Sequence, residues 1–123
     1  MEELYKELIL ELYRHPLNKR LVSGYNAHAQ ATNPSCGDVI DIFIKFGKDD
    51  QIEEVGFQGV GCAISQAAVS LLTEECKGKS RKQLQKMSID DVKTMLGVTV
   101  SENRLNCAAL GWKALQKSLT EKI

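Results

Sequence analysis

The sequence predicts a small α+β fold, in which an antiparallel sheet of three strands packs against about four to five helices. Polar side chains alternate with alanine or tyrosine over residues 25–32, as in a strand with one buried face. Two apolar runs, at 39–46 and 52–58, flank a polar turn and are typical of a β-hairpin. Apolar residues at helical spacing occur over 2–14 and again after residue 61. We expect residues 1–123 to form one domain, because this length supports a core of its own.

An amphipathic helix is expected over residues 2–14. Its apolar stripe consists of Leu4, Leu8 and Leu12, widened by Tyr5, Ile9 and Tyr13. The helix should end at His15, because the proline that follows this histidine disfavours α-helical geometry at the preceding residue. We interpret His15 as a solvated residue at a helix end, and His28 as an outward-facing side chain of the first strand.

The hairpin carries the largest apolar face of the predicted sheet. Alternation along the first of its two strands places four residues on that face, namely Ile40, Ile42, Ile44 and Phe46. The second strand returns with Val55 and Phe57 after a polar turn at 47–51. This hairpin is therefore expected to be the centre of the sheet.

A helix is expected to begin at Cys62, where the positive end of the helix dipole favours an anionic sulfur. Three glycines precede it, Gly56, Gly59 and Gly61. A phosphate-binding loop is disfavoured, because no Gly-Lys-Ser/Thr follows them. The glycines are instead expected to let the backbone bend and to bring Cys62 next to the turn that carries Cys36.

Three further helices are predicted. Ser80 and Ser88 each begin a capping-box pattern, and Gly97 is expected to end the second of these short helices. The last helix is expected over residues 102–121, with an apolar stripe made of Leu105, Ala108, Ala109, Trp112, Leu115 and Leu119. Cys107 lies off this stripe, and the small residues on its face, Gly111 and Ala114, are expected to leave space beside the thiol.

The composition excludes several classes of function. Sixteen basic and sixteen acidic residues cancel, so the chain has no general attraction for nucleic acid or anionic membranes. No apolar run approaches the ~18 residues of a membrane span. The N-terminal segment is acidic and amphipathic, unlike a secretory signal. We therefore expect a cytoplasmic protein that binds neither nucleic acid nor membranes.

The four cysteines are expected to be metal ligands, reactive thiols or core residues, since disulfides are rare in a reducing compartment. Cys36 and Asp38 share one turn but cannot complete a metal site alone, and the chain offers Cys62 and Cys107 elsewhere. No Cys-x-x-Cys is present, which disfavours a thioredoxin-type pair or a zinc ribbon. Cys76 is expected at the negative end of a helix, next to two glutamates, and we interpret it as lying outside any site.

Three segments carry a resemblance to a known family. Asn-Pro-x-Cys-Gly-Asp at 33–38, Gly-x-Gly-Cys-Ala-Ile-Ser at 59–65 and Arg-x-x-Cys-Ala-x-Leu-x-Trp-Lys-Ala-Leu at 104–115 occur in this order. They resemble the IscU/SufU/NifU N-terminal family of iron–sulfur cluster assembly proteins, from Tyr13 to Leu119. The resemblance implies a SufE/NifU-like α+β fold with a three-stranded antiparallel sheet covered by helices.

The resemblance also implies a site and a function. It joins Cys36, Asp38, Cys62 and Cys107 into one ligand set for a [2Fe–2S] cluster, or for zinc in the same place. It implies that the protein receives sulfur from a cysteine desulfurase, assembles the cluster and passes it to acceptor apo-proteins. A homodimer around a shared cluster is compatible with this role. Sulfur acceptance is expected at one of the three cysteines, by position Cys107 in a scaffold. In the zinc branch, a desulfurase histidine would free the accepting cysteine from the metal.

The donor set makes chemical sense for such a role. Three thiolates with one carboxylate suit either zinc or iron, and the single hard oxygen among soft sulfurs should exchange more readily than a fourth thiolate. A protein that hands a cluster on benefits from one labile ligand. Arg104, one helical turn before Cys107, is expected to offset part of the negative charge of the ligands or, as an alternative, to be a surface residue.

Several functions stay open at this point. The scaffold is favoured over a zinc-dependent sulfur relay of the SufU type, and both are favoured over a purely structural zinc site. A scaffold would have no turnover of its own, whereas the relay would act as a sulfurtransferase. A zinc deaminase is disfavoured, because its His-x-Glu and Pro-Cys-x-x-Cys patterns are missing. The chain also differs from both branches of the family. Asn106 stands where the IscU branch has histidine, and residues 98–102 replace the Leu-Pro-Pro-Val-Lys chaperone segment of that branch. The insertion that the SufU branch has before the last helix is missing.

Overall fold

The computed structural model describes residues 2–34, 37–97 and 102–120. Its strands and helices follow in the order α1 (Glu2–Arg14), β1 (Ala27–Asn33), β2 (Asp38–Phe46), a short 3₁₀ turn (Lys48–Asp50), β3 (Ile52–Val60), α2 (Ala63–Cys76), α3 (Arg81–Gln85), α4 (Ile89–Leu96), α5 (Glu102–Ala108) and α6 (Leu110–Thr120). Among the described residues, no helix combines the length and apolar character that crossing a bilayer requires.

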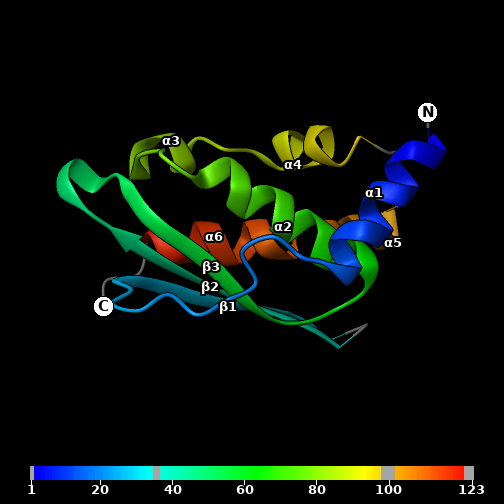
Figure 1. Ribbon diagram of the computed structural model, residues 1–123, viewed down its shortest axis with the longest axis horizontal. Helices are drawn as coiled ribbons and strands as arrows, with labels where there is room; N and C mark the ends of the chain where they lie inside the picture. The colour runs from blue at the N-terminus through cyan, green and yellow to red at the C-terminus, as the bar shows by residue number, and fades with distance from the viewer. Residues whose placement is uncertain (1, 35–36, 98–101, 121–123) are drawn as a thin grey trace.

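The predicted three-stranded antiparallel sheet is confirmed, with the strand order β1-β2-β3. Strand β2 is central, and its register pairs Ile42 with Ala29 on one side and with Phe57 on the other. The face formed by Ile40, Ile42, Ile44 and Phe46 is buried, as the alternation predicted. Helices α2 and α6 lie side by side on this face, with α6 over β1 and β2 and α2 nearer β3 (Figure 1). The core lies between the sheet and the pair α2 and α6, and it continues on the other side of this pair, where Leu84 of α3 and Val92 and Leu96 of α4 are buried.

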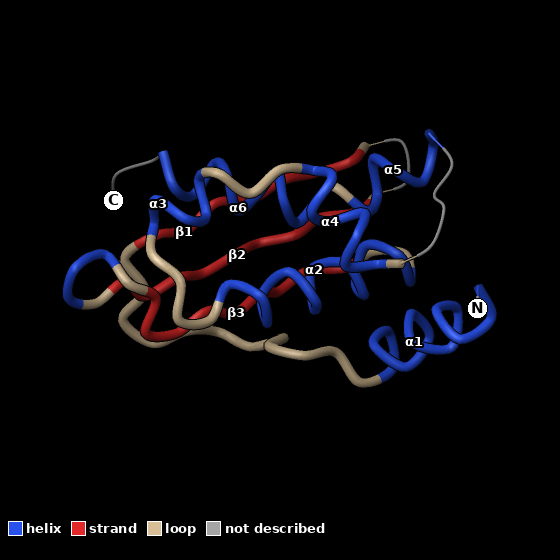
Figure 2. The backbone as a smooth tube through the Cα atoms, turned by 90° about the horizontal axis from the view of Figure 1, so that it is seen from above, coloured by secondary structure: helices blue, strands red, loops and turns tan. Residues whose placement is uncertain are grey.

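Two helix predictions differ from the structure. In α1, Ile9 and Leu12 are buried against the body, whereas Leu8 and Tyr13 are 38% and 50% exposed. The buried side of α1 is narrower than the predicted stripe, because α1 packs mainly against a single neighbour, α2 (Figure 2). The predicted last helix is divided at Ala109 into α5 and α6. This division gives six α-helices among the described residues instead of about four to five.

The small residues predicted near Cys107 lie in a closely packed part of α6. Gly111 and Ala114 are expected to leave space beside Cys107, and both are buried. A Cβ at Gly111 would lie 2.8 Å from Val69 Cγ2, so the glycine lets α6 and α2 pack closely. The small residues on this face of α6 therefore allow close contact between the two helices.

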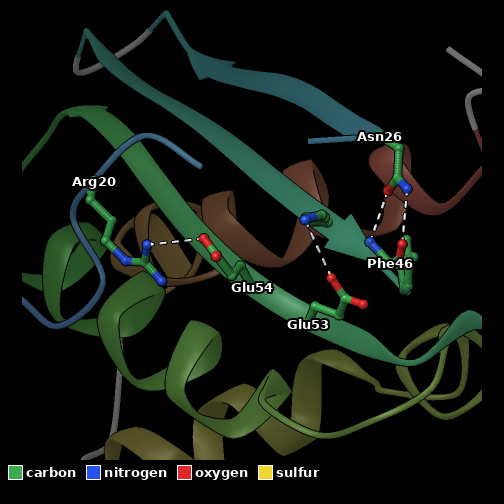
Figure 3. Close-up of polar contacts among 6 residues, drawn as sticks. Arg20, Asn26, Phe46, Glu53 and Glu54 are labelled. Carbon is green, nitrogen blue, oxygen red and sulfur yellow. Dashed lines mark hydrogen bonds and ion pairs between the residues drawn. The ribbon is translucent and has the colours of Figure 1, made fainter. Parts of the chain in front are cut away.

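The segment between α1 and β1 is fixed along the edge of the sheet. The Phe57 amide donates to the Asn18 carbonyl at 2.9 Å, and Arg20 pairs with Glu54 at 3.3 Å. Asn26 exchanges two hydrogen bonds with the Phe46 backbone, at 3.0 and 2.8 Å (Figure 3). These bonds fix the backbone at the start of β1. They thereby help to position the turn that follows this strand.

Cys76 ends α2 and is fully buried. Burial raises the pKa of its thiol from 9.0 to about 12, with Lys79 opposing this shift and Glu75 adding to it. The prediction that this cysteine disfavours a thiolate is confirmed, although burial is the main cause and the glutamate charge is a minor one.

The raised pKa of Cys76 predicts a loss of stability at alkaline pH. Above pH 9.0 the unfolded chain releases the thiol proton while the folded protein keeps it, up to about pH 12. The unfolded state then binds fewer protons, so the free energy of unfolding should fall by roughly 1 kcal/mol per pH unit in this window. Urea unfolding of the wild type and Cys76→Ala across this range measures the effect. We expect a shallower slope for the variant, and parallel slopes would contradict the assignment.

Candidate metal centre

Three segments that are far apart in the sequence meet at one end of the sheet. Asp38 begins β2, Cys62 directly precedes α2 and Cys107 lies in α5. One ligand atom from each residue lies within 4.8 Å of the other two. This spacing is compatible with ligands of a single ion, whose bonds to sulfur are about 2.3 Å long. Cys36, the fourth residue of the predicted set, lies outside the described residues.

Asp38 is the most constrained of the three. Its side chain is buried, with 3% of the residue exposed, and Oδ1 accepts a hydrogen bond from the Cys62 amide at 3.3 Å. Within the described part of the chain, the buried Oδ2 has no hydrogen-bond partner. A buried polar atom left without a partner costs about 1–3 kcal/mol, and more when it is charged. A bound cation at Oδ2 would remove this penalty, so the residues present fit a metal.

The two thiols differ in their exposure. Cys62 is exposed and occupies the N-cap position of α2, just before the first turn in which it was predicted. Cys107 is buried, with 8% of the residue exposed, and its sulfur lies 3.9 Å from Asn33 Nδ2. The site therefore has one accessible sulfur and one that faces the protein interior.

The glycines before Cys62 make room for the site. A Cβ at Gly61 would overlap Ser65 Oγ and approach the Asp38 carboxyl carbon to 3.1 Å. Gly59 has a φ of +131°, and a Cβ there would overlap the Val39 carbonyl oxygen. The expected role of these glycines, a bend that brings Cys62 next to the turn after β1, agrees with this close approach to Asp38.

The other candidate residues take different positions. Arg104 is exposed on α5, one turn before Cys107, and Asn106 is exposed as well. His15 is exposed, and His28 contacts Asp41 at 2.9 Å on the sheet face opposite the core. Residues 98–101, most of the segment compared with the chaperone motif, lie outside the described residues.

One neighbour of the site was not recognised from the sequence. The Asn-Pro pair at 33–34 is typical of a turn, and the contact of Asn33 with Cys107 joins residues that are distant in the chain. A signal was available in the strand pattern, because Asn33 continues the alternation of the alanines in β1 and faces the same side.

A family model described as "NifU-like N terminal domain" matches residues 4–121. The zinc-dependent sulfurtransferase SufU of Bacillus subtilis (strain 168) is 30% identical over 139 residues, covering 99% of this chain and 93% of that protein. The iron–sulfur cluster assembly scaffold protein IscU of Streptococcus pyogenes serotype M1 is 28% identical, covering 97% and 84%. The crystal structure of FiSufU from the thermophile Fervidobacterium islandicum AW-1 matches with a TM-score of 0.78 at 25% identity, covering 93% and 95%. The matches span all three converging segments.

Proposed function

The chain belongs to the family of NifU-like N-terminal domains, and on this basis we propose that it is a scaffold for iron–sulfur cluster assembly. In this role it receives sulfur from a cysteine desulfurase, holds a [2Fe–2S] cluster as cargo and passes it to acceptor apo-proteins. Residues 1–123 act as one domain, and the protein works in the cytoplasm. The cluster ligands are Cys36, Asp38, Cys62 and Cys107, with Arg104 as a nearby positive charge.

The observation that carries this proposal is the buried oxygen of Asp38 next to two thiols, which has no hydrogen-bond partner among the described residues. A fourth thiolate would hold iron or zinc more tightly, whereas a hard oxygen among soft sulfurs exchanges more readily. Oδ1 is already held by the Cys62 amide, which leaves Oδ2 as the atom that can bind and release the metal. One exchangeable ligand suits a cluster that must leave.

Exposure distinguishes the two described thiols of the site, Cys62 and Cys107, as possible acceptors of sulfur. Cys107 was the predicted acceptor, yet it is buried, and Cys62 is the thiol that a partner can reach without rearrangement. A Cys62 thiolate would attack the outer sulfur of a desulfurase persulfide. A new S–S bond forms on Cys62, the S–S bond of the desulfurase breaks, and its cysteine leaves as the thiolate. An external electron donor must then reduce this sulfur to sulfide.

A zinc-dependent sulfur relay is the second candidate. It is supported by the similarity to the zinc-dependent sulfurtransferase of Bacillus subtilis and by a donor set that suits tetrahedral zinc. In this case the same residues hold zinc, and the protein accelerates a desulfurase without building a cluster. A homodimer around a shared cluster is proposed only for the scaffold, because the relay builds no cluster for a second subunit to surround.

Anaerobic reconstitution with iron, cysteine and a desulfurase tests the proposal. We expect absorption bands of a [2Fe–2S] cluster, with about two irons and two sulfides per site. The bands should be lost in Cys62→Ser and Cys107→Ser and kept in Cys76→Ala, the matched cysteine control away from the site. A colourless protein that retains zinc and speeds sulfide release would identify the relay instead. A zinc-loaded protein that neither forms a cluster nor speeds sulfide release, and that unfolds when the zinc is chelated, would identify a structural site.

A further inference from the structure

The adjoining ends of β1 and β2 present two polar side chains to the site. Asn33 and Asp38 are the last cross-strand partners of the β1–β2 ladder, so they lie opposite each other at the same level of the hairpin. Both follow the buried alternation of their strands and face the helices. The Gly37 amide donates to the Asn33 carbonyl at 2.9 Å, which closes the turn above this pair.

Each member of the pair contacts a different cysteine segment. Asp38 Oδ1 accepts from the Cys62 amide at 3.3 Å, and Asn33 Nδ2 lies 3.9 Å from Cys107 Sγ, as a donor to sulfur. The end of the hairpin therefore connects α2 through the carboxylate and α5 through the amide. Asp38 has a place in the proposed ligand set, whereas Asn33 has no role in it.

We propose that Asn33 is a positioning residue, whose side-chain N–H holds the Cys107 sulfur in place and stabilises it as a metal ligand. This inference rests on the proposed function only in requiring that Cys107 binds a metal. It does not depend on whether that metal is zinc or the iron of a cluster.

The chemistry favours the metal-loaded state. A metal-bound thiolate carries negative charge and is a stronger hydrogen-bond acceptor than a neutral thiol, so the N–H bond gains strength when the metal binds. Contacts that hold a ligand from outside the coordination sphere typically change metal affinity by about 10–100-fold. At 3.9 Å the bond is long, so we expect the lower end of this range for Asn33.

Titration with Co²⁺ of the metal-free full-length chain tests the inference. The sulfur-to-metal charge-transfer bands of bound Co²⁺ report directly on the thiolates. Their measurement requires neither cluster assembly nor a desulfurase. We expect Asn33→Ala to bind Co²⁺ about tenfold more weakly, with these bands shifted to lower energy because the sulfur loses a donor. Asn33→Leu keeps the branched shape without the N–H and should behave as Asn33→Ala does. Thr32→Ala, at the exposed neighbouring position, should match the wild type.

The outcomes separate the inference from the proposed function. Wild-type affinity and band positions in both Asn33 variants would overturn the inference while leaving the metal site intact. Wild-type behaviour of Asn33→Leu alone would show that Asn33 acts through its shape, which also overturns it. A wild-type chain that takes up no Co²⁺ would overturn the metal site, and the inference with it. Thermal unfolding of the metal-free variants confirms that each of them folds.

Discussion

Replacing Asp38 by alanine is expected to slow the release of an assembled cluster measurably. The carboxylate is the one hard donor in the proposed ligand set, and iron in a sulfide cluster prefers thiolates. An acceptor protein must insert its own ligand at some point of the cluster, and the exchangeable oxygen is the weakest point. Without Asp38 the cluster has no exchangeable carboxylate ligand, and we expect it to persist.

The two oxygens of Asp38 make different contacts, so a second substitution can separate their effects on cluster release. Oδ1 holds the Cys62 amide, whereas the buried Oδ2 is the atom without a partner among the described residues. Asp38→Asn keeps an acceptor for this amide but removes the negative charge. If the charged oxygen governs release, Asp38→Asn and Asp38→Ala should both retain the cluster longer. If only the backbone contact matters, Asp38→Asn should resemble the wild type.

Transfer to an apo-ferredoxin, followed by circular dichroism of the moving cluster, measures this release. Asp41→Ala is the matched control, because it removes a carboxylate from the same strand on the opposite face, where Asp41 contacts His28. We expect this control to transfer its cluster at the wild-type rate. An Asp38→Ala protein that loses its cluster faster than the wild type would mean that the carboxylate anchors the cluster instead of releasing it.

The fold was predictable where one physical pattern dominates. Alternation along β2 is strict because the core covers one face of the sheet, so Ile40, Ile42 and Ile44 could be assigned from the sequence. The two capping boxes at Ser80 and Ser88 form as predicted, since they depend only on residues three positions apart. The pattern in α1 was less informative, because the burial of Leu8 depends on a neighbour that local sequence does not specify.

The structure brings Asp38, Cys62 and Cys107 together, but local sequence patterns could not predict this geometry. Separations of 24 residues from Asp38 to Cys62 (62 − 38) and of 45 from Cys62 to Cys107 (107 − 62) follow no local rule, so only the family resemblance joined them. Their convergence depends on the register of β1 and β2 and on the packing of α6 against α2 at Gly111. The contact of Asn33 with Cys107 has the same origin, since it requires a strand end and a helix to meet.

Gly59→Ala is expected to destabilise the protein by about 3–5 kcal/mol, a large part of the stability of a domain of this size. Two causes act together at this position. The φ of +131° is one that side-chain-bearing residues rarely adopt, and the new Cβ would overlap the Val39 carbonyl oxygen. Backbone atoms of the paired strand cannot move aside as a flexible side chain could, so the β2–β3 ladder must open near Asp38.

Gly78→Ala is the matched control for this substitution. Gly78 also has a positive φ, of +77°, but a Cβ there would have no atom within 4 Å. It should therefore cost only the conformational strain of about 1–2 kcal/mol. Thermal unfolding should show a fall in Tm of roughly 10–20 °C for Gly59→Ala and a smaller fall for Gly78→Ala. Because Gly59 lies three residues before Cys62, its variant should also lose Co²⁺ binding, whereas Gly78→Ala should keep it. Equal losses of stability in the two variants would mean that strain alone, and not the clash with Val39, determines the requirement for glycine next to the metal centre.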